Sequence, residues 1–342
     1  MSASLMRRAT AALIKAGTLP AMLAMNRHAK SYYTVEFISA GLASGALAAM
    51  SFGPRSLAAL ALELDVTPGM EDGLAAWLDL GVSVGLLARR GDEYGVRRAA
   101  ASLLAPHNDS VAAFYTELSG LHHRLVAETP ERLREGRPFE LSDADPALIA
   151  RTSRMSAPYI EAVMREVVPA TGQVRLLEVG CGSGAHIATA AALNPQLTAV
   201  GLELQPEVAD QARSNIERWV LSARVRIDDG DVRDRHGTGD ADLVTLHQNI
   251  YYFRFCERVT LLRHLATHLR PGGHVVITTF CRSGAHAAAA LDLWGAMTHG
   301  ADRLPEIPEL RAQLEEAGYT DVRAEQVTPD GMFCAFIGAR PL

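Results

Sequence analysis

Three closely spaced glycines after an apolar stretch are the strongest chemical signal in this sequence. The segment Leu176-Leu-Glu-Val-Gly-Cys-Gly-Ser-Gly184 places them directly before a segment of helical character. Glycine adopts positive φ angles without strain and lets a ligand lie against bare backbone, and a helix start offers unpaired N–H groups. Glu178, two residues before the first glycine, would repel a pyrophosphate and attract an ammonium group. The pattern therefore favours a ligand with a cationic end over a dinucleotide.

Two acidic residues further along have the types and positions to hold a nucleoside. Glu203 ends the next apolar segment, where a carboxylate can accept hydrogen bonds from both hydroxyls of a ribose. Asp231 follows the third apolar segment, where a carboxylate can accept from the exocyclic amine of adenine. Farther on, the run Leu269-Arg-Pro-Gly-Gly273 predicts a sharp turn into another strand.

Together these four features resemble the class I S-adenosylmethionine-dependent methyltransferases, closely over about residues 172–281. The resemblance implies S-adenosylmethionine as methyl donor, S-adenosylhomocysteine as product, and no metal. Carried over by motif, the implied cofactor residues are Glu178, Gly180, Cys181, Gly182 and Gly184 for the methionyl part, Glu203 for the ribose, Leu204, Asp231 and Val232 for adenine, and His247 and Gln248 beside them.

The segment from His247 to Phe253, after the fourth predicted strand, is expected to pass beside the transferred methyl group. Bacterial and plant-type small-molecule O-methyltransferases, which the chain also resembles, often have a His-Asp pair here, with the histidine as base. Tyr251 and Tyr252 stand at that place, which puts O-methylation by a histidine base in doubt. We take His247 as the first candidate for a base or orienting donor, and Tyr252 and then Tyr251 as the next. Alternatively, His247 lines the cofactor and the tyrosines pack in a lid.

The elements that position these residues alternate between strands and helices beyond residue 173. Apolar runs predict strands at 174–179, 197–204, 224–227, 243–246 and 274–279, with helices at 184–193, 206–221 and 257–269. Such alternation predicts a parallel sheet with helices on both faces. The resemblance adds two closing strands, at 319–327 and 332–340, and an antiparallel last strand. The predicted fold class is α/β, with a Rossmann-like seven-stranded methyltransferase sheet at residues 169–342.

Residues 1–168 are predicted to form a mainly α-helical, winged-helix-like domain. Two short helices at 57–64 and 68–80 precede a hairpin at 83–96, and longer helices follow at 110–126 and 143–168, with breaks at Thr129-Pro130 and Arg137-Pro138 between them. DNA binding and a dimerisation or substrate-covering role are the two interpretations. Acidic residues on both short helices favour the second, because DNA phosphates would repel them. The uncharged segment 37–53 predicts a buried helix, and a dimer interface is the place we expect for it.

Composition limits the function classes. A net charge of −6 and a pI near 6.1 argue against a nucleic-acid partner. Four scattered cysteines without a CxxC pair fit a reducing, cytoplasmic setting. The N-terminal stretch is broken by Lys15, Gly17 and Pro20, so we expect an amphipathic arm that docks on the body, not a secretory or membrane segment.

The sequence thus predicts a cytoplasmic, homodimeric methyltransferase that acts on a small, aromatic or heteroaromatic molecule at O, N or C. Two alternatives stay open. A protein or peptide methyltransferase would need an open groove, and a non-catalytic winged-helix regulator would use the cofactor fold for sensing.

Overall fold

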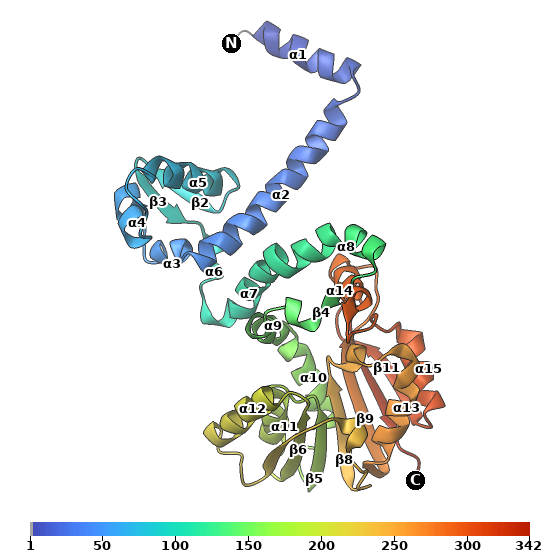
Figure 1. Ribbon diagram of the computed structural model, residues 1–342. Coiled ribbons are helices and arrows are strands. Elements are labelled where there is room, and N and C mark those ends of the chain that lie inside the picture. Colours follow the sequence, from blue (N-terminus) through green and yellow to red (C-terminus); the bar gives the residue numbers. More distant parts are fainter. Residues whose placement is uncertain (1–2) are drawn as a thin grey trace. The chain divides into compact units, whose positions relative to one another are not determined.

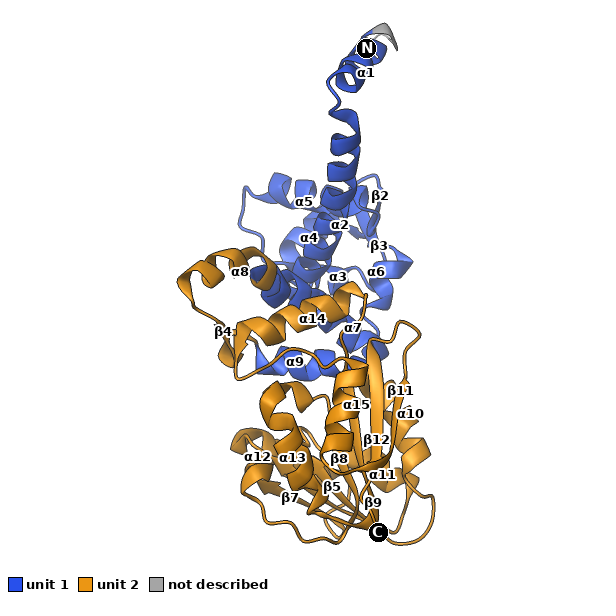
Figure 2. Cartoon of the chain, turned by 90° about the vertical axis from the view of Figure 1, so that its right-hand side faces the viewer, with its two compact units in different colours: residues 1–124, 145–155 blue, residues 125–144, 156–342 orange. Residues whose placement is uncertain are grey.

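The computed structural model describes residues 3–342, which form two compact units (Figure 2). Unit 1 comprises residues up to 124 together with 145–155, and unit 2 comprises 125–144 and 156–342. The domain boundary predicted between residues 168 and 169 differs from this division. The reason is helix α10 (Ala157–Val167), whose Ile160 and Met164 belong to the core of the C-terminal sheet.

Unit 2 is built on one seven-stranded sheet of order β11-β12-β9-β8-β5-β6-β7 (Figure 1). The strands are β5 (Val174–Val179), β6 (Leu197–Glu203), β7 (Val225–Asp229), β8 (Ala241–His247), β9 (Leu269–Phe280), β11 (Thr320–Gln326) and β12 (Phe333–Ala339). Strand β12 is antiparallel to both neighbours, and the other pairs are parallel. The predicted seven-stranded sheet with an antiparallel last strand is confirmed.

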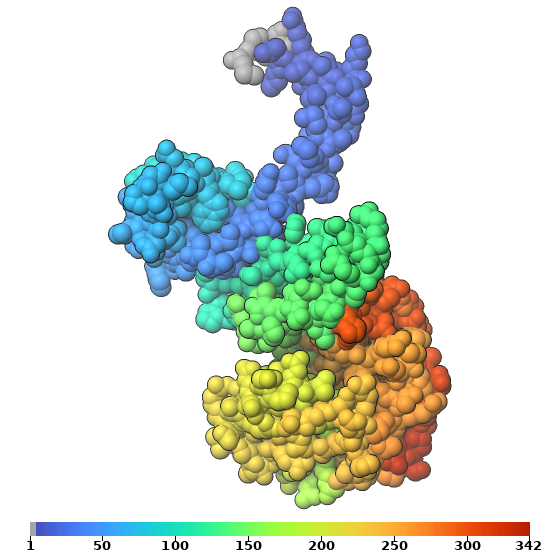
Figure 3. All heavy atoms as spheres, in the orientation of Figure 1, coloured from blue at the N-terminus to red at the C-terminus, as the bar shows by residue number. Residues whose placement is uncertain are grey.

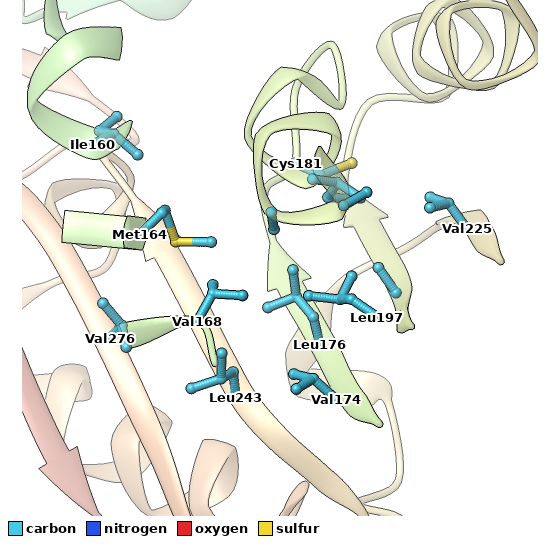
Figure 4. Close-up of a cluster of buried hydrophobic side chains, with 14 of the residues drawn as sticks. Ile160, Met164, Val168, Val174, Leu176, Cys181, Leu197, Val225, Leu243 and Val276 are labelled. Carbon is cyan, nitrogen blue, oxygen red and sulfur yellow. The ribbon is translucent and has the colours of Figure 1, made fainter. Parts of the chain in front are cut away.

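Each face of the sheet carries its own hydrophobic core, because side chains alternate along a strand. Leu176 and Leu243 face the helices α10, α11 (Ala185–Leu193) and α12 (Pro206–Arg218), and Figure 4 shows this core. Leu177 and Val244 face α13 (Phe255–Ala266) and α15 (Ile307–Glu316). Every parallel strand therefore ends at one edge of a sheet that is covered on both sides, as the alternation of elements predicts.

Unit 2 also contains a segment between the sheet strands β9 and β11 that joins residues from much earlier in the chain. Helix α14 (His286–Met297) leads into β10 (Thr298–His299), which pairs in parallel with β4 (Phe139–Glu140). Helix α8 (His123–Glu135) precedes β4 and runs through Pro130, so the predicted break at Thr129-Pro130 is wrong. Pro130 and Val126 are both exposed, so water can replace the backbone bond that proline removes.

Unit 1 has the predicted helix, helix and hairpin order. Helices α4 (Leu57–Glu63) and α5 (Glu71–Ser83) precede the hairpin β2 (Leu87–Arg90) and β3 (Glu93–Val96), and β1 (Arg55–Ser56) adds a third strand. The remaining helices are α1 (Ala3–Lys15), α2 (Leu19–Ala43), α3 (Ala46–Ala49), α6 (Arg98–Ser102), α7 (Asp109–Glu117) and α9 (Pro146–Thr152). The predicted helix at 143–168 is therefore two helices, α9 and α10, that belong to different units.

The apolar segment 37–53 is buried at its beginning, as predicted, but by its own unit. Phe37 stacks on Trp77 with ring centroids 4.5 Å apart, and Gly81 makes room for the Phe37 ring. The helix ends at Ala43, and Gly45 follows with a φ of 78°. A dimer interface is therefore not needed to account for the burial of Phe37.

The N-terminal arm consists of α1 and the first half of α2, and its docking on the body stays a prediction. No described side chain before Phe37 is buried, and Figure 3 shows these residues in dark blue. None of the described helices is both long and apolar enough to cross a bilayer.

Candidate functional site

The glycine loop between β5 and α11 is held against the end of β6. Gly180, Gly182 and Gly184 have φ angles of 66°, 53° and 77°, which a side chain would strain. The backbone N–H groups of Gly180 and Cys181 donate to the Leu202 carbonyl at 2.8 and 3.0 Å. Cys181 is buried in the core beneath the loop, so only its backbone is available to a ligand.

Glu203 fixes this loop from the end of β6. Its Oε2 accepts a hydrogen bond from the Gly182 N–H at 2.9 Å, and its Oε1 accepts from the Gln205 N–H at 3.2 Å. The Glu203 carbonyl accepts from Gly230 N–H, in the turn after β7, at 2.9 Å. The carboxylate keeps further acceptor capacity and is partly exposed, which suits the ribose position implied by the resemblance.

Glu178 lies beneath the loop as a fully buried carboxyl group. Neither of its oxygens has a hydrogen-bond partner, and Thr245, its neighbour in register on β8, has an unpartnered hydroxyl. Burial first, and then the Glu203 carboxylate, raise the pKa of Glu178 well above its ordinary value. A buried carboxyl without a partner destabilises the fold unless a ligand meets it. The ammonium group of S-adenosylmethionine has the charge and donors to do so, and the residues present therefore fit this cofactor.

The three residues expected around adenine differ in exposure. Leu204 is 61% exposed at the end of β6 and offers an apolar surface, whereas Val232 is buried and contributes its carbonyl to His264. Asp231 is not free, because its carboxylate accepts from the backbone and the guanidinium of Arg233. The Arg233 guanidinium also lowers the pKa of Asp231. Arg233 is a partner that sequence reasoning missed.

His247 ends β8 with one ring nitrogen bonded and the other free. Its Nδ1 shares a hydrogen bond of 2.8 Å with the Thr278 hydroxyl, and its buried Nε2 has no partner. The ring meets that of His186, at the start of α11, edge to face at 5.0 Å. Burial and the neighbouring His186 lower the pKa of His247 well below its ordinary value, and burial lowers that of His186 to about 4. Both rings are therefore neutral at pH 7.

Gln248 and Asn249 turn the chain away from β8. Gln248 has a φ of 55° and bonds through its side chain to the Ser156 hydroxyl. Asn249 donates from its amide to the Val179 carbonyl and lies over Gly180, where a Cβ would meet that amide at 2.5 Å. The buried Oδ1 of Asn249 has no partner. Sequence reasoning missed Asn249 as it missed His186, although its place after the fourth strand was a signal.

Tyr251 and Tyr252 pack with Trp294 of α14. Ring centroids lie 5.0 Å apart between the two tyrosines, and 6.2 and 6.0 Å from Tyr251 and Tyr252 to Trp294. Tyr251 is buried, whereas Tyr252 is 43% exposed. Desolvation and then the Glu203 carboxylate raise the pKa of Tyr252, so this phenol keeps its proton at pH 7. Within residues 3–342, no three His, Cys, Asp or Glu side chains gather as a metal site would require.

Sequence comparison matches residues 177–275 to the family described as "Methyltransferase domain". The chain is 39% identical over 89 residues to protein-L-isoaspartate O-methyltransferase 2 of Marinobacter nauticus, across 26% of this chain and 38% of that protein. It is 27% identical over 268 residues to demethylspheroidene O-methyltransferase of Rhodobacter capsulatus, across 74% of this chain and 66% of that one. The chain thus spans less than two thirds of these curated relatives.

Solved structures resemble the chain over nearly its whole length. Mitomycin 7-O-methyltransferase has a TM-score of 0.78 at 21% identity, covering 95% of this chain and 99% of its own. Human N-acetylserotonin methyltransferase, solved with S-adenosylmethionine, has a TM-score of 0.71 at 18% identity, covering 94% and 98%. At this identity the likeness concerns the fold. Together with the match of residues 177–275 to the methyltransferase family model, it shows that the sheet of unit 2 has the fold of class I S-adenosylmethionine-dependent methyltransferases.

Proposed function

We propose that the protein transfers a methyl group from S-adenosylmethionine to a small, aromatic or heteroaromatic acceptor at O, N or C. The observation that carries this proposal is the fully buried, unpartnered Glu178 beneath a glycine loop whose Gly182 N–H donates to Glu203. When bound, the cofactor supplies an electrophilic methyl group. The protein binds and orients it: Glu178 and the loop hold the methionyl end, Glu203 the ribose, and Leu204 one face of adenine.

Whether the protein must also supply a base depends on whether the acceptor atom has to lose a proton before it attacks the methyl group. A hydroxyl benefits from a base by roughly 10²–10⁴-fold, whereas a neutral amine or an electron-rich carbon attacks without one. His247 is the candidate base, because its Nε2 is free, but its lowered pKa makes it a weak one. Placement in line with the methyl group therefore carries most of the catalysis in this proposal.

Incubation with methyl-labelled cofactor and fractionated cell extract tests the activity. Label in small organic products supports the proposal. Label in proteins would instead favour the peptide-methylating alternative, which the similarity to protein-L-isoaspartate O-methyltransferases keeps open. Tight S-adenosylhomocysteine binding with no label transfer would favour the regulator, and a gel-shift assay would then examine the winged-helix-like part of unit 1.

We also propose that the protein forms a homodimer through its N-terminal arm. The arm exposes several large apolar side chains, namely Leu5, Met6, Ile14, Met22, Leu23, Met25, Tyr32 and Tyr33. It carries basic residues and no acidic residue before Glu36, whereas the whole chain has a net charge of −6. Exposed apolar surface of this extent is typical of an interaction site, and the charge suits the acidic body of a second copy. Light scattering of the full chain and of Leu23→Lys tests this: a monomeric wild type contradicts it.

A further inference from the structure

The rings of Tyr252 and Trp294 form a surface that the proposed reaction has so far left unused, here called the aromatic wall. The buried Tyr251 ring packs against the rings of both Tyr252 and Trp294. The two wall residues meet nearly at right angles, with an interplanar angle of 85°, and Tyr252 keeps 43% of its surface exposed. The wall therefore combines a fixed geometry with an open ring.

Hydrogen bonds to the backbone hold the segment that carries Tyr252 in place. The Asp302 N–H donates to the Tyr251 carbonyl at 2.7 Å, and the Asp302 carboxylate accepts from Phe255 N–H at 2.6 Å. Arg258, buried beneath, donates to the carbonyls of Phe253 and Arg303 at 3.0 and 2.9 Å. These bonds clamp the segment after β8 between two neighbouring loops.

Contacts of helix α14 hold the Trp294 ring in place as well. Gly295 brings α14 against the Asp302 carbonyl, which a Cβ there would meet at 2.2 Å. Asp292, on the same helix, accepts from Leu304 N–H at 3.0 Å. Trp294 also packs on a small core formed by Leu125, Phe139 and Met297. Rings fixed before binding lose little conformational freedom when a ligand stacks on them.

The wall stands at the end of the sheet where the cofactor residues converge. Tyr252 follows β8, whose last residue is His247, and β8 runs parallel to β5 and its glycine loop. The Glu203 carboxylate is near enough for its charge to act on the Tyr252 phenol. This phenol stays protonated at neutral pH, so it can donate a hydrogen bond but cannot serve as a base.

We propose that a planar, conjugated acceptor stacks on the aromatic wall, and that the Tyr252 hydroxyl donates a hydrogen bond to an oxygen or nitrogen atom on that acceptor. Tyr252 and Trp294 then determine which acceptors enter, and Tyr252 supplies recognition at the place where the resembled O-methyltransferases often have a His-Asp pair. This inference rests on the proposed methyltransferase function, and it narrows the acceptor to a flat ring system with a polar substituent.

The test compares 1-naphthol with its saturated counterpart, decahydro-1-naphthol, by calorimetry on the protein loaded with S-adenosylhomocysteine. Both probes carry a hydroxyl, and only the first has flat π faces, so the ratio of their dissociation constants reports stacking. We expect the wild type to prefer 1-naphthol. Trp294→Leu and Tyr252→Leu should each reduce this preference by about 2- to 12-fold, the range for one aromatic pair.

Tyr252→Phe separates the ring from the hydroxyl. It should weaken both probes by about 2- to 12-fold, the range for one hydrogen bond, and leave their ratio unchanged. Trp219→Leu is the matched control, because Trp219 is a partly exposed tryptophan that follows α12 and precedes β7, at the opposite end of the strands. Trp219→Leu should change neither the two dissociation constants nor their ratio.

Three results would overturn the inference while leaving the proposed function standing: no binding of either probe, no preference in the wild type, or a preference that survives both leucine variants. Failure of the wild type to bind S-adenosylhomocysteine is a different result, and it would overturn the proposed function itself. Unchanged S-adenosylhomocysteine affinity in every variant shows that the wall residues act on the acceptor and not on the fold.

Discussion

The backbone N–H of Gly182 donates a 2.9 Å hydrogen bond to Oε2 of Glu203. This single bond joins the two features that the sequence marks separately, the glycine loop after β5 and the carboxylate at the end of β6. It orients the carboxylate across the carboxyl ends of the central strands, where ligands of open α/β sheets bind. In the proposed function, where Glu203 holds the ribose, ribose recognition and loop conformation depend on the same side chain.

Replacement of Glu203 by alanine should weaken cofactor binding. Loss of charge-assisted hydrogen bonds to two hydroxyls corresponds to about 1.5–3 kcal/mol, or roughly 10–150-fold in the dissociation constant of S-adenosylhomocysteine. Calorimetry measures this dissociation constant. Glu207→Ala, an exposed glutamate in the first turn of α12, serves as the control and should bind normally. An unchanged constant in Glu203→Ala would show that the ribose lies elsewhere.

Replacement of Glu178 by glutamine should have two separate effects, one on the pH dependence of the free energy of unfolding and one on cofactor affinity. A carboxyl whose pKa is raised in the folded state stabilises the fold below its unfolded pKa, near 4.5, and this contribution is lost as pH rises through the folded pKa. Without ligand, the wild type should therefore lose stability relative to Glu178→Gln as pH rises above 4.5, by up to about 1.4 kcal/mol per pH unit. Thermal denaturation across pH 5–9 measures the difference.

The same variant should lose affinity for S-adenosylhomocysteine, because an amide cannot pair with the ammonium charge. Binding to the wild type should release a proton as Glu178 ionises, so calorimetric heats should differ between buffers of different ionisation enthalpy. Heats of Glu178→Gln should not depend on the buffer in this way. Equal proton release by both proteins would mean that the cationic group meets another residue.

The strands and the cofactor loop could be predicted from sequence because their signals are local. Strand β5 has the predicted bounds, since apolar residues run without interruption before the glycines. Glu178, Glu203 and Asp231 follow from their places at strand ends. The pairing of Asp231 with Arg233 is also local, but it depends on a rotamer that spacing does not determine.

The rest of the site depends on contacts between segments far apart in sequence. His186 reaches His247 because the first turn of α11 passes over the end of β8, and Asn249 reaches Val179 for a similar reason. Trp294 comes from an insertion after β9 whose path follows from β10 pairing with β4. No short-range pattern carries this information, and therefore sequence reasoning missed all three roles.

Two glycines of α5 provide a matched test of packing in unit 1. A Cβ at Gly81 would lie 2.3 Å from Cζ of Phe37, whereas one at Gly73 would meet nothing closer than 3.8 Å. Gly81→Ala should therefore reduce the free energy of unfolding by about 1–3 kcal/mol through overpacking. Gly73→Ala should increase it by about 0.5–1 kcal/mol, because alanine favours the helix. Urea denaturation compares them, and equal effects would contradict the tight Phe37 contact.

Replacement of His247 by alanine decides how the acceptor loses its proton. If His247 is the base, kcat should fall by about 10²–10⁴-fold, while the affinity for S-adenosylhomocysteine holds. His123→Ala, at an exposed histidine of α8, should leave kcat unchanged. Because burial and His186 lower the pKa of His247, the acid limb of the wild-type pH–rate profile should lie below pH 6.5, the ordinary imidazole value. His247→Ala should abolish that limb.

A loss of cofactor affinity with an unchanged profile would instead assign His247 to the cofactor site. If neither kcat nor affinity changes, placement alone carries the reaction, and an amine or carbon acceptor is favoured over a hydroxyl, because only the hydroxyl needs a base to release its proton before attack.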